Sequence, residues 1–491
     1  MIEKANQFIK ANQERVNPRY RQTYHLMPPI GWMNDPNGFS LYNNRYHLFY
    51  QYYPYKESWN SMHWGHTTTT DFVTWQNEDV ALAPDQPYDA AGCFSGSAIE
   101  YNGKLYIMYT SVHKDGEQNI QEQALAVSED GIHFTKSERN PVIPSSALPK
   151  SICPGDFRDP KLFRLNDRFY SAVVARDEML GGRMLLFESF DLEHWSYKCD
   201  YIQPKQGFGT MWECPDIFEI DDRYAVLMSV IYLPREGYHY WNKQSTVYAL
   251  GRLDDKGESL TDYQFHEIDC GFDFYAPQTV QASDGRRIMT AWMQAWEDSI
   301  PTEDLQHGWA GSMILPRELT VENGLLVQQP VREIENYRVD KVSYEQVDIV
   351  EEEVHLHKIN GSSIEIELEA DLTSADSFTV NLFETKDNKI VITYDKKQEE
   401  LTFDRSHSGI KISPKNFRKP DFRTLPVKLD QNKLQLRIFV DTCSVEVFVQ
   451  KGSIVITSRV YPLGDEYEVG FSAKGKAIIN KISKWELNCN L

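Results

Sequence analysis

One pattern of polar and apolar residues occurs five times in the first two thirds of the chain. Each copy begins with a polar pair such as Asn-Gly or Asn-Asp and continues into an apolar and aromatic run, which predicts a tight turn followed by a buried strand. The copies begin at Asn43, Asn102, Asn166, Asp221 and Asp284. Their spacing of roughly 60 residues provides room for one four-stranded antiparallel sheet with its loops.

A second phrase repeats with the same spacing. In it, an Asp is followed by a short segment that ends in an aromatic residue, at 71–75, 130–134 and 191–195. Two phrases that keep the same step indicate a repeated structural unit. Five such units predict a five-bladed β-propeller.

The pattern changes after about residue 335. Apolar and polar residues then alternate, as at 363–368 and 433–440, which predicts half-buried strands and favours a β-sandwich. The opening segment 2–15 has the character of a short helix packed outside the propeller. We therefore expect an all-β chain with an N-terminal helical extension (1–20), a catalytic five-bladed β-propeller (21–335), a linker (336–345) and a C-terminal β-sandwich (346–491).

The charge balance excludes some partners. Lys and Arg number 51 and Asp and Glu number 72, so the formal net charge is −21. This balance disfavours a nucleic-acid or anionic-membrane surface role, although a local basic pocket for a small phosphorylated sugar stays open. The 13% share of aromatic residues suits a sugar-binding protein, because sugar C–H faces pack on rings, and it suits a strand-rich core equally well.

The cysteines and the apolar segments bear on location and cofactors. The seven cysteines are scattered without a C-x-x-C pair or a metal-like spacing, so we expect free thiols, no metal and no cofactor. Residues 1–10 lack the apolar run of a secretory signal, and there is no stretch of about eighteen apolar residues that could span a membrane. We expect a cytoplasmic protein whose partner is a small sugar, with a homodimer left open.

Acidic residues stand just upstream of the repeated turn in three of the five units. Asp35, Asp159 and Glu213 each precede their turn by seven or eight residues, and Ser95 and Tyr275 stand near this place in the other two units. Equivalent blades would bring these positions to one mouth of the central channel. Converging carboxylates repel one another and lose solvation, which points to a functional site. The alternative for any single acid is ordinary Asp-Pro turn chemistry.

Several segments carry a resemblance to a known family. The segment 25–38, His-Leu-Met-Pro-Pro-Ile-Gly-Trp-Met-Asn-Asp-Pro-Asn-Gly, resembles the signature of glycoside hydrolase family 32, the invertase and fructanase family. Further similar segments follow in family order at 94–97, 158–160, 212–216, 274–278, 437–448 and 457–462. The resemblance implies a five-bladed propeller, a C-terminal sandwich and net retention of configuration. It also implies that Asp35 is the nucleophile, Asp159 the transition-state stabiliser and Glu213 the general acid/base.

The resemblance also implies a set of residues that bind fructose. The candidates are Trp32, Asn34, Gln51, Trp59, Phe94, Ser95, Arg158, Cys214, Tyr275 and Trp292. Trp292 rests on its position in the motif alone, and Cys214 is interpreted as a buried neighbour of the site and not as a nucleophile. The alternatives are a structural ion pair for Arg158 and a rim aromatic for Trp59.

Hydrolysis of a fructoside with retention requires two carboxyl groups. Cleavage of a fructoside builds oxocarbenium character at the anomeric carbon, so one carboxylate must attack while an acid protonates the leaving oxygen. Retention predicts that the carboxyl groups of Asp35 and Glu213 lie about 5–5.5 Å apart. Because the three acids precede the sandwich, we expect the sandwich to contribute no catalytic acid.

Three other functions remain open from the sequence. The first is hydrolysis of sucrose-6-phosphate; Trp59 and the segment 60–66 look more like invertases of unphosphorylated sucrose, and Lys56, His63 and Arg183 are candidate phosphate contacts or simply solvated charges. The second is an inverting arabinan or xylan hydrolase on a related propeller. The third is a sugar-binding propeller without catalysis, for which the loss of one acid would be the mark.

Overall fold

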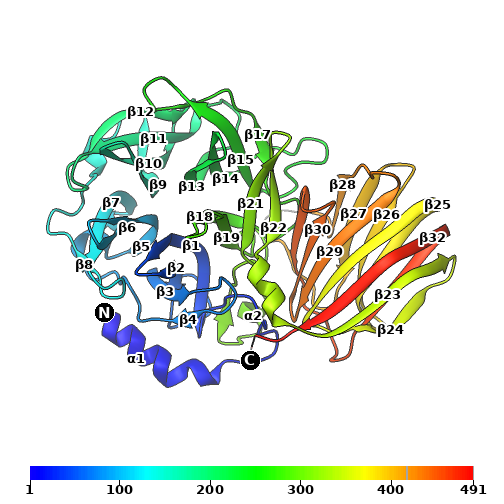
Figure 1. Ribbon diagram of the computed structural model, residues 1–491. Coiled ribbons are helices and arrows are strands. Elements are labelled where there is room, and N and C mark those ends of the chain that lie inside the picture. Colours follow the sequence, from blue (N-terminus) through cyan, green and yellow to red (C-terminus); the bar gives the residue numbers. More distant parts are fainter. Residues whose placement is uncertain (416–418, 490–491) are drawn as a thin grey trace.

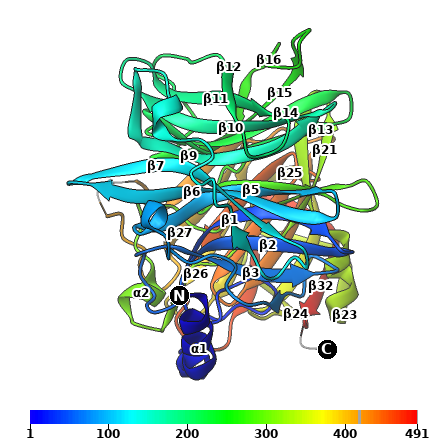
Figure 2. The same cartoon turned by 90° about the vertical axis from the view of Figure 1, so that its left-hand side faces the viewer.

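The computed structural model describes residues 1–415 and 419–489. Five antiparallel sheets are arranged around a central axis, and a β-sandwich packs against one side of this ring (Figure 1; Figure 2). The prediction of an all-β chain with a five-bladed propeller and a C-terminal sandwich is confirmed. The exact domain boundaries stay a prediction, and the expected sandwich range includes 416–418 and 490–491, which lie outside the described residues.

Each blade is built from consecutive strands. Blade 1 contains β1 (Gly31–Tyr42), β2 (Arg45–Tyr53), β3 (His63–Thr69) and β4 (Gln76–Asn77), with β20 (Trp309–Ala310) beside β1. Blade 2 contains β5 (Gly92–Tyr101), β6 (Lys104–Asp115), β7 (Gln118–Ser128) and β8 (Thr135–Lys136). Blade 3 contains β9 (Ile152–Leu165), β10 (Arg168–Asp177), β11 (Gly181–Ser189) and β12 (Ser196–Ile202). Blade 4 contains β13 (Met211–Ile220), β14 (Arg223–Ile231), β15 (Gln244–Leu253), β16 (Leu260–Thr261) and β17 (Phe265–Glu267). Blade 5 contains β18 (Tyr275–Gln281), β19 (Arg287–Trp292), β21 (Arg317–Glu322) and β22 (Leu325–Pro330).

The repeated polar phrase forms the hairpin between the first two strands of every blade. Asn43 and Asn44 have φ of 49° and 59°, and Asn102 and Gly103 have φ of 52° and 72°. Left-handed backbone at both positions is what a two-residue hairpin requires, because its twist then matches the flanking strands. Asn and Gly tolerate this conformation, which explains why the phrase recurs.

The first strands of the blades form the innermost layer of the propeller. β1 contacts β5, β5 contacts β9, β9 contacts β13, β13 contacts β18, and β18 returns to β1. Each of the five has a break in register against its neighbour near the position of the candidate site residue. Such β-bulges turn side chains out of the strand alternation and occur often beside active sites.

Within residues 338–415 and 419–489, the sandwich contains ten strands. They are β23 (Arg338–Val350), β24 (Val354–Asn360), β25 (Ile364–Glu384), β26 (Lys389–Asp395), β27 (Glu400–His407), β28 (Phe422–Pro426), β29 (Lys433–Asp441), β30 (Ser444–Val449), β31 (Ile454–Arg459) and β32 (Glu468–Leu487). The predicted alternation is present: Ile364, Ile366 and Leu368 are buried on one face of β25. Residues 338–345, which we expected in a linker, are paired with β32 as the first part of β23.

The propeller and the sandwich meet through a buried ionic network. His25 contacts Asp441 at 2.8 Å through Nδ1 and Glu446 at 2.9 Å through Nε2. Arg317, at the start of β21, donates to the second oxygen of Glu446 at 2.6 Å and to Asp269 at 2.9 Å. Buried charges are tolerated only when they are paired in this way, so the network favours one docking geometry.

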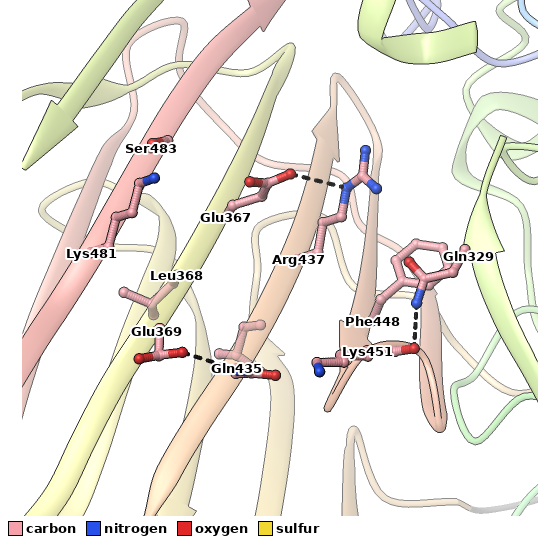
Figure 3. Close-up of a pocket in the computed structure, with 11 residues that line it drawn as sticks. Gln329, Glu367, Leu368, Glu369, Gln435, Arg437, Phe448, Lys451, Lys481 and Ser483 are labelled. Atoms are coloured by element: carbon pink, nitrogen blue, oxygen red, sulfur yellow. Dashed lines mark hydrogen bonds and ion pairs between the residues drawn. The ribbon is translucent and has the colours of Figure 1, made fainter. Parts of the chain in front are cut away.

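A cavity of about 360 Å³ lies where β25, β29 and β32 face β22 (Figure 3). Its wall is polar, but its carboxylates already have partners: Glu369 accepts from Gln435 at 3.0 Å, and Glu367 accepts from Arg338 at 2.8 Å.

The helices are few. Helix α1 (Ile2–Asn12) lies outside the propeller, followed by a 3-10 turn at Gln13–Arg15, and α2 (Pro301–Asp304) is a single turn (Figure 1). The other 3-10 turns are Pro87–Asp89, Ser145–Ala147 and Arg332–Tyr337. Among the described residues, no helix is long and apolar enough to cross a membrane.

Candidate active site

A pocket of about 510 Å³ opens at the mouth of the propeller channel. Its wall contains the three candidate acids, Asp35, Asp159 and Glu213, which come from β1, β9 and β13. The other lining residues are Asn34, Gln51, Trp59, Phe94, Ser95, Asn119, Gln121, Gly155, Asp156, Arg158, Ile231, Gln244 and Trp296. All of them belong to the propeller, and the absence of a catalytic acid from the sandwich stays a prediction.

The bulges place the acids on two adjacent levels of the channel. Asp159, Cys214 and Ala276 have φ of 61°, 48° and 54°, and each precedes a proline. They therefore occupy corresponding places on neighbouring strands. Glu213 stands one residue earlier, level with Arg158 and Tyr275. Counting back from the turns treated distances of seven and eight residues as one level. The bulges in β9 and β13 have the same size, so the one-residue difference between Asp159 and Glu213 is a real offset.

Asp35 is held by one of its two carboxylate oxygens. Its Oδ2 accepts from the Ser95 hydroxyl and from the Cys214 thiol, each at 3.5 Å. Its Oδ1 is buried and has no hydrogen-bond partner. An unpaired buried carboxylate oxygen is unusual and marks a place where a ligand atom is expected.

Asp159 is fixed by the backbone around it. Its Oδ2 accepts from the amide N–H of Cys214 at 2.9 Å, and its own N–H donates to Thr110 at 2.9 Å. Burial and the nearby carboxylates raise the pKa of the Cys214 thiol well above its usual value, so this thiol stays protonated. Cys214 therefore acts as a hydrogen-bond donor between Asp35 and Asp159.

Glu213 accepts hydrogen bonds from side chains of the two adjacent blades. Arg158 on β9 donates to Oε1 through Nε at 3.1 Å and through NH2 at 2.8 Å. The hydroxyl of Tyr275 on β18 donates to Oε2. The same guanidinium also contacts Asp156 at 3.1 Å, so Arg158 joins the catalytic level to the outer part of the pocket.

The site carries excess negative charge. Burial, followed by the charges of Glu213 and Asp159, raises the pKa of Asp35 to about 7. Burial also raises the pKa of Asp159 to about 6, although Arg158 opposes this shift. Titrating carboxyls this close to one another share protons as a group.

Aromatic side chains surround the acids. Trp59 is 46% exposed at the rim, with its ring centroid 5.9 Å from that of Phe94. Trp32 is buried and donates to Asn34 at 2.7 Å, which orients the Asn34 amide. Gln51 donates to the carbonyl of Cys93 at 3.0 Å.

The structure brings Trp296, and not Trp292, to the pocket wall. Trp292 is fully buried behind Trp296, with ring centroids 4.8 Å apart. Within the described part of the chain, Trp32, Cys214 and Tyr275 also lie outside the lining but contact lining residues.

Sequence reasoning missed the residues of the outer wall. They are Asn119, Gln121, Gly155, Asp156, Ile231, Gln244 and Trp296. Most of them lie on later strands or before the bulges, which a count from the hairpin turns does not reach. A usable signal was present at Asn119 and Gln121, because these polar residues alternate on a strand that otherwise becomes apolar.

The candidate phosphate contacts lie away from the pocket wall. His63 is buried, burial lowers its pKa to about 4, and its Nδ1 faces the carbonyl of Ser61. Arg183 is paired with Asp177 and Asp200. Lys56 is exposed and is absent from the described lining.

Comparison with known families identifies the chain. The family described as "Glycosyl hydrolases family 32 N-terminal domain" matches residues 25–330, and "Glycosyl hydrolases family 32 C terminal" matches residues 333–486. The chain belongs to glycoside hydrolase family 32. It is therefore a glycosidase, which excludes the sugar-binding propeller without catalysis and the arabinan or xylan hydrolase as classes for this chain.

Relatives of the family 32 chain agree over its whole length. A sucrose-6-phosphate hydrolase of Escherichia coli is 38% identical, with 98% of each chain covered. A β-fructofuranosidase variant of Bombyx mori, solved in complex with sucrose, is 30% identical with a TM-score of 0.86, covering 99% of this chain and 98% of that chain. A sucrose-6-phosphate hydrolase of Lactobacillus gasseri is 29% identical with a TM-score of 0.88, covering 99% and 97%.

Proposed function

We propose that the chain is a retaining β-fructofuranosidase that releases fructose from sucrose or short fructooligosaccharides. The observation that carries this proposal is the state of Asp35, whose Oδ2 is held by Ser95 and Cys214 while its Oδ1 is buried without a partner. A carboxylate anchored by one oxygen presents the other as a positioned nucleophile.

In the first step, Oδ1 of Asp35 attacks the anomeric carbon of the fructosyl group. The bond to the leaving oxygen breaks, and Glu213 transfers its proton to that oxygen. In the second step, Glu213 takes a proton from water, the water oxygen attacks the anomeric carbon, and Asp35 leaves. Two displacements give net retention.

Asp159 has the role of stabilising the fructosyl group in both transition states. Its fixed carboxylate lies beside Asp35, where a negative charge favours the oxocarbenium character of the sugar. Arg158 and Tyr275 position Glu213 from two sides.

The electrostatic coupling between Asp35 and Glu213 supports these roles. The pKa of Asp35 is raised partly by the charge of Glu213, so placing one proton on Glu213 removes that cause and favours ionised Asp35. The reaction itself requires one proton on the pair, located on Glu213, because that proton passes to the leaving oxygen.

A second candidate is hydrolysis of sucrose-6-phosphate, which the names of the Escherichia coli and Lactobacillus gasseri relatives favour. Cytoplasmic location and a homodimer likewise remain proposals. The test is a comparison of initial rates on sucrose, sucrose-6-phosphate, kestose and inulin, with NMR detection of the first anomer of fructose. Release of β-fructofuranose supports the proposal, and release of the α-anomer or no release from any fructoside contradicts it.

A further inference from the structure

The outer wall of the pocket occupies strand positions next to those of Glu213 and Arg158. Gln244 pairs with Ile231, and Ile231 pairs with Met211, which precedes Glu213 by two residues. Asp156 likewise precedes Arg158 by two residues on β9. Because Glu213 protonates the leaving oxygen, the leaving group extends from Glu213 toward this outer wall.

The pocket as a whole is acidic. Its described lining contains four carboxylates, Asp35, Asp156, Asp159 and Glu213, and one cation, Arg158. Arg158 is already paired with Glu213 at 2.8 Å and with Asp156 at 3.1 Å. A sugar phosphate, which carries a charge between about −1.5 and −2 at neutral pH, would meet net repulsion here.

Among the described residues, Arg176, Lys243 and Lys114 are basic neighbours of the wall, and Lys114 on β6 pairs with Asn119 on β7. Arg176 is paired with the second oxygen of Asp156 at 2.6 Å. The ammonium group of Lys243 lies 4.2 Å from the ring centroid of Tyr232. Lys243 directly precedes the lining residue Gln244, so Lys243 and Lys114 are the lysines that could contact a phosphate group.

The outer wall offers carboxamides to the leaving group. Gln121 is buried, and its Oε1 accepts from the backbone N–H of Phe157 at 3.0 Å and from Arg158 at 3.3 Å, which leaves its NH₂ group to donate. The carboxamide oxygen of Gln244 has no hydrogen-bond partner. Asn119 completes the wall from β7. Carboxamides both donate and accept, which matches sugar hydroxyls.

We propose that Asn119, Gln121 and Gln244 form a leaving-group subsite that selects an uncharged sugar and discriminates against a 6-phosphate. This inference rests on the proposed function and specifies its substrate as free sucrose. It separates the chain in specificity from relatives whose names state sucrose-6-phosphate hydrolysis.

The direct test is the salt dependence of kcat/KM for sucrose and for sucrose-6-phosphate. Sucrose is expected to be preferred by at least about tenfold at low salt. Added salt screens repulsion, so kcat/KM for sucrose-6-phosphate should rise with ionic strength while that for sucrose stays level. A preference for sucrose-6-phosphate that weakens as salt is added would overturn the proposal, because it would reveal an attractive phosphate site.

Two variants locate the effect. Gln244→Leu should lower the ratio of kcat/KM for sucrose to that for methyl β-fructofuranoside by about tenfold, because only sucrose has a second sugar to contact Gln244. An unchanged ratio would remove Gln244 from the subsite. The matched control is Gln329→Leu in the cavity of Figure 3, which should leave the ratio unchanged.

Lys243→Met and Lys114→Met test the two lysines next to the wall. Each should leave kcat/KM for sucrose-6-phosphate unchanged or slightly higher, and a fall confined to the phosphorylated substrate would assign phosphate binding to that lysine and overturn the proposal. The failure of the proposed function is distinguishable, since in that case the unmodified protein would cleave neither methyl β-fructofuranoside nor sucrose.

Discussion

Arg158 reaches across from blade 3 and donates two hydrogen bonds to a single oxygen of Glu213 on blade 4, at 3.1 and 2.8 Å. The two residues stand at corresponding places on adjacent inner strands. The pair is part-buried inside a cluster of carboxylates, so it sets both the position of Glu213 and the charge around it. An acid/base residue held this way stays near the leaving oxygen only while the guanidinium is present.

Arg158→Lys should lower kcat/KM for sucrose by about 10- to 100-fold, because an ammonium group cannot reproduce the planar pair of donors. The control is Arg183→Lys, which loses contacts to Asp177 and Asp200 in the same blade but outside the pocket. The control should lower Tm while leaving kcat/KM unchanged. Equal activity losses in both variants would show that Arg158 acts through the stability of blade 3.

The pH profile should depend on Asp35. Its pKa is raised to about 7 by burial and then by Glu213 and Asp159, and Asp35 must be ionised to attack, so kcat/KM should fall as pH drops through this range. Asp159→Asn removes one source of negative charge and should move this acidic limb to lower pH. The measurement uses a fructoside with an acidic leaving group, which needs no proton from Glu213. A limb that stays in place or moves upward would contradict the assignment.

The raised pKa of Asp35 also predicts that ionisation of this carboxyl lowers the free energy of unfolding. A carboxyl whose pKa is raised in the folded state stabilises the fold when protonated, and this contribution is lost as pH rises from about 4 to 7. Asp35→Asn removes the titrating group and should raise the free energy of unfolding above pH 7 by up to about 4 kcal/mol, with little change at pH 4. Urea unfolding at both pH values measures it. An equal change in the free energy of unfolding at both pH values would indicate an effect of packing instead of ionisation.

His25 predicts a second pH dependence, at the junction of the two domains. Burial lowers its pKa, but the hydrogen bonds to Asp441 and Glu446 outweigh burial and raise the pKa to about 9. The stability it provides is present below pH 6.5 and is lost as pH rises through about 9, by up to about 3 kcal/mol. His25→Gln should flatten the stability profile between these values. A variant that keeps the slope of the unmodified protein would exclude His25 as its source.

The sequence predicts the propeller well because the same hairpin pattern recurs in every blade. Asn102-Gly103 and the equivalent pairs mark hairpins through their left-handed backbone, which only a few residue types adopt easily. Alternation in β25 likewise marks a strand with one buried face. These properties are local, so a single sequence carries them.

Features that depend on contacts between distant strands could not be predicted from the sequence. The second bulge of β1, between Asn37 and Ser40, changes the count from Asp35 to its turn relative to blades 3 and 4, and no residue pattern marks it. Gln244 reaches the pocket because β15 lies beside β14, far from any recognisable motif. Trp296 displaces Trp292 from the wall through packing within an aromatic cluster, which a motif position cannot reveal.

The central claim is the division of roles between Asp35 and Glu213, and azide tests it most directly. Glu213→Gln should lose several orders of magnitude on sucrose, lose less at the fructosylation step on a fructoside with an acidic leaving group, and yield fructosyl azide with retained configuration when azide replaces base-assisted water. Asp35→Asn should be disabled on both substrates, since no covalent intermediate forms. If Asp35→Asn showed the leaving-group dependence and the azide product with retained configuration while Glu213→Gln did not, the two roles would have to be exchanged.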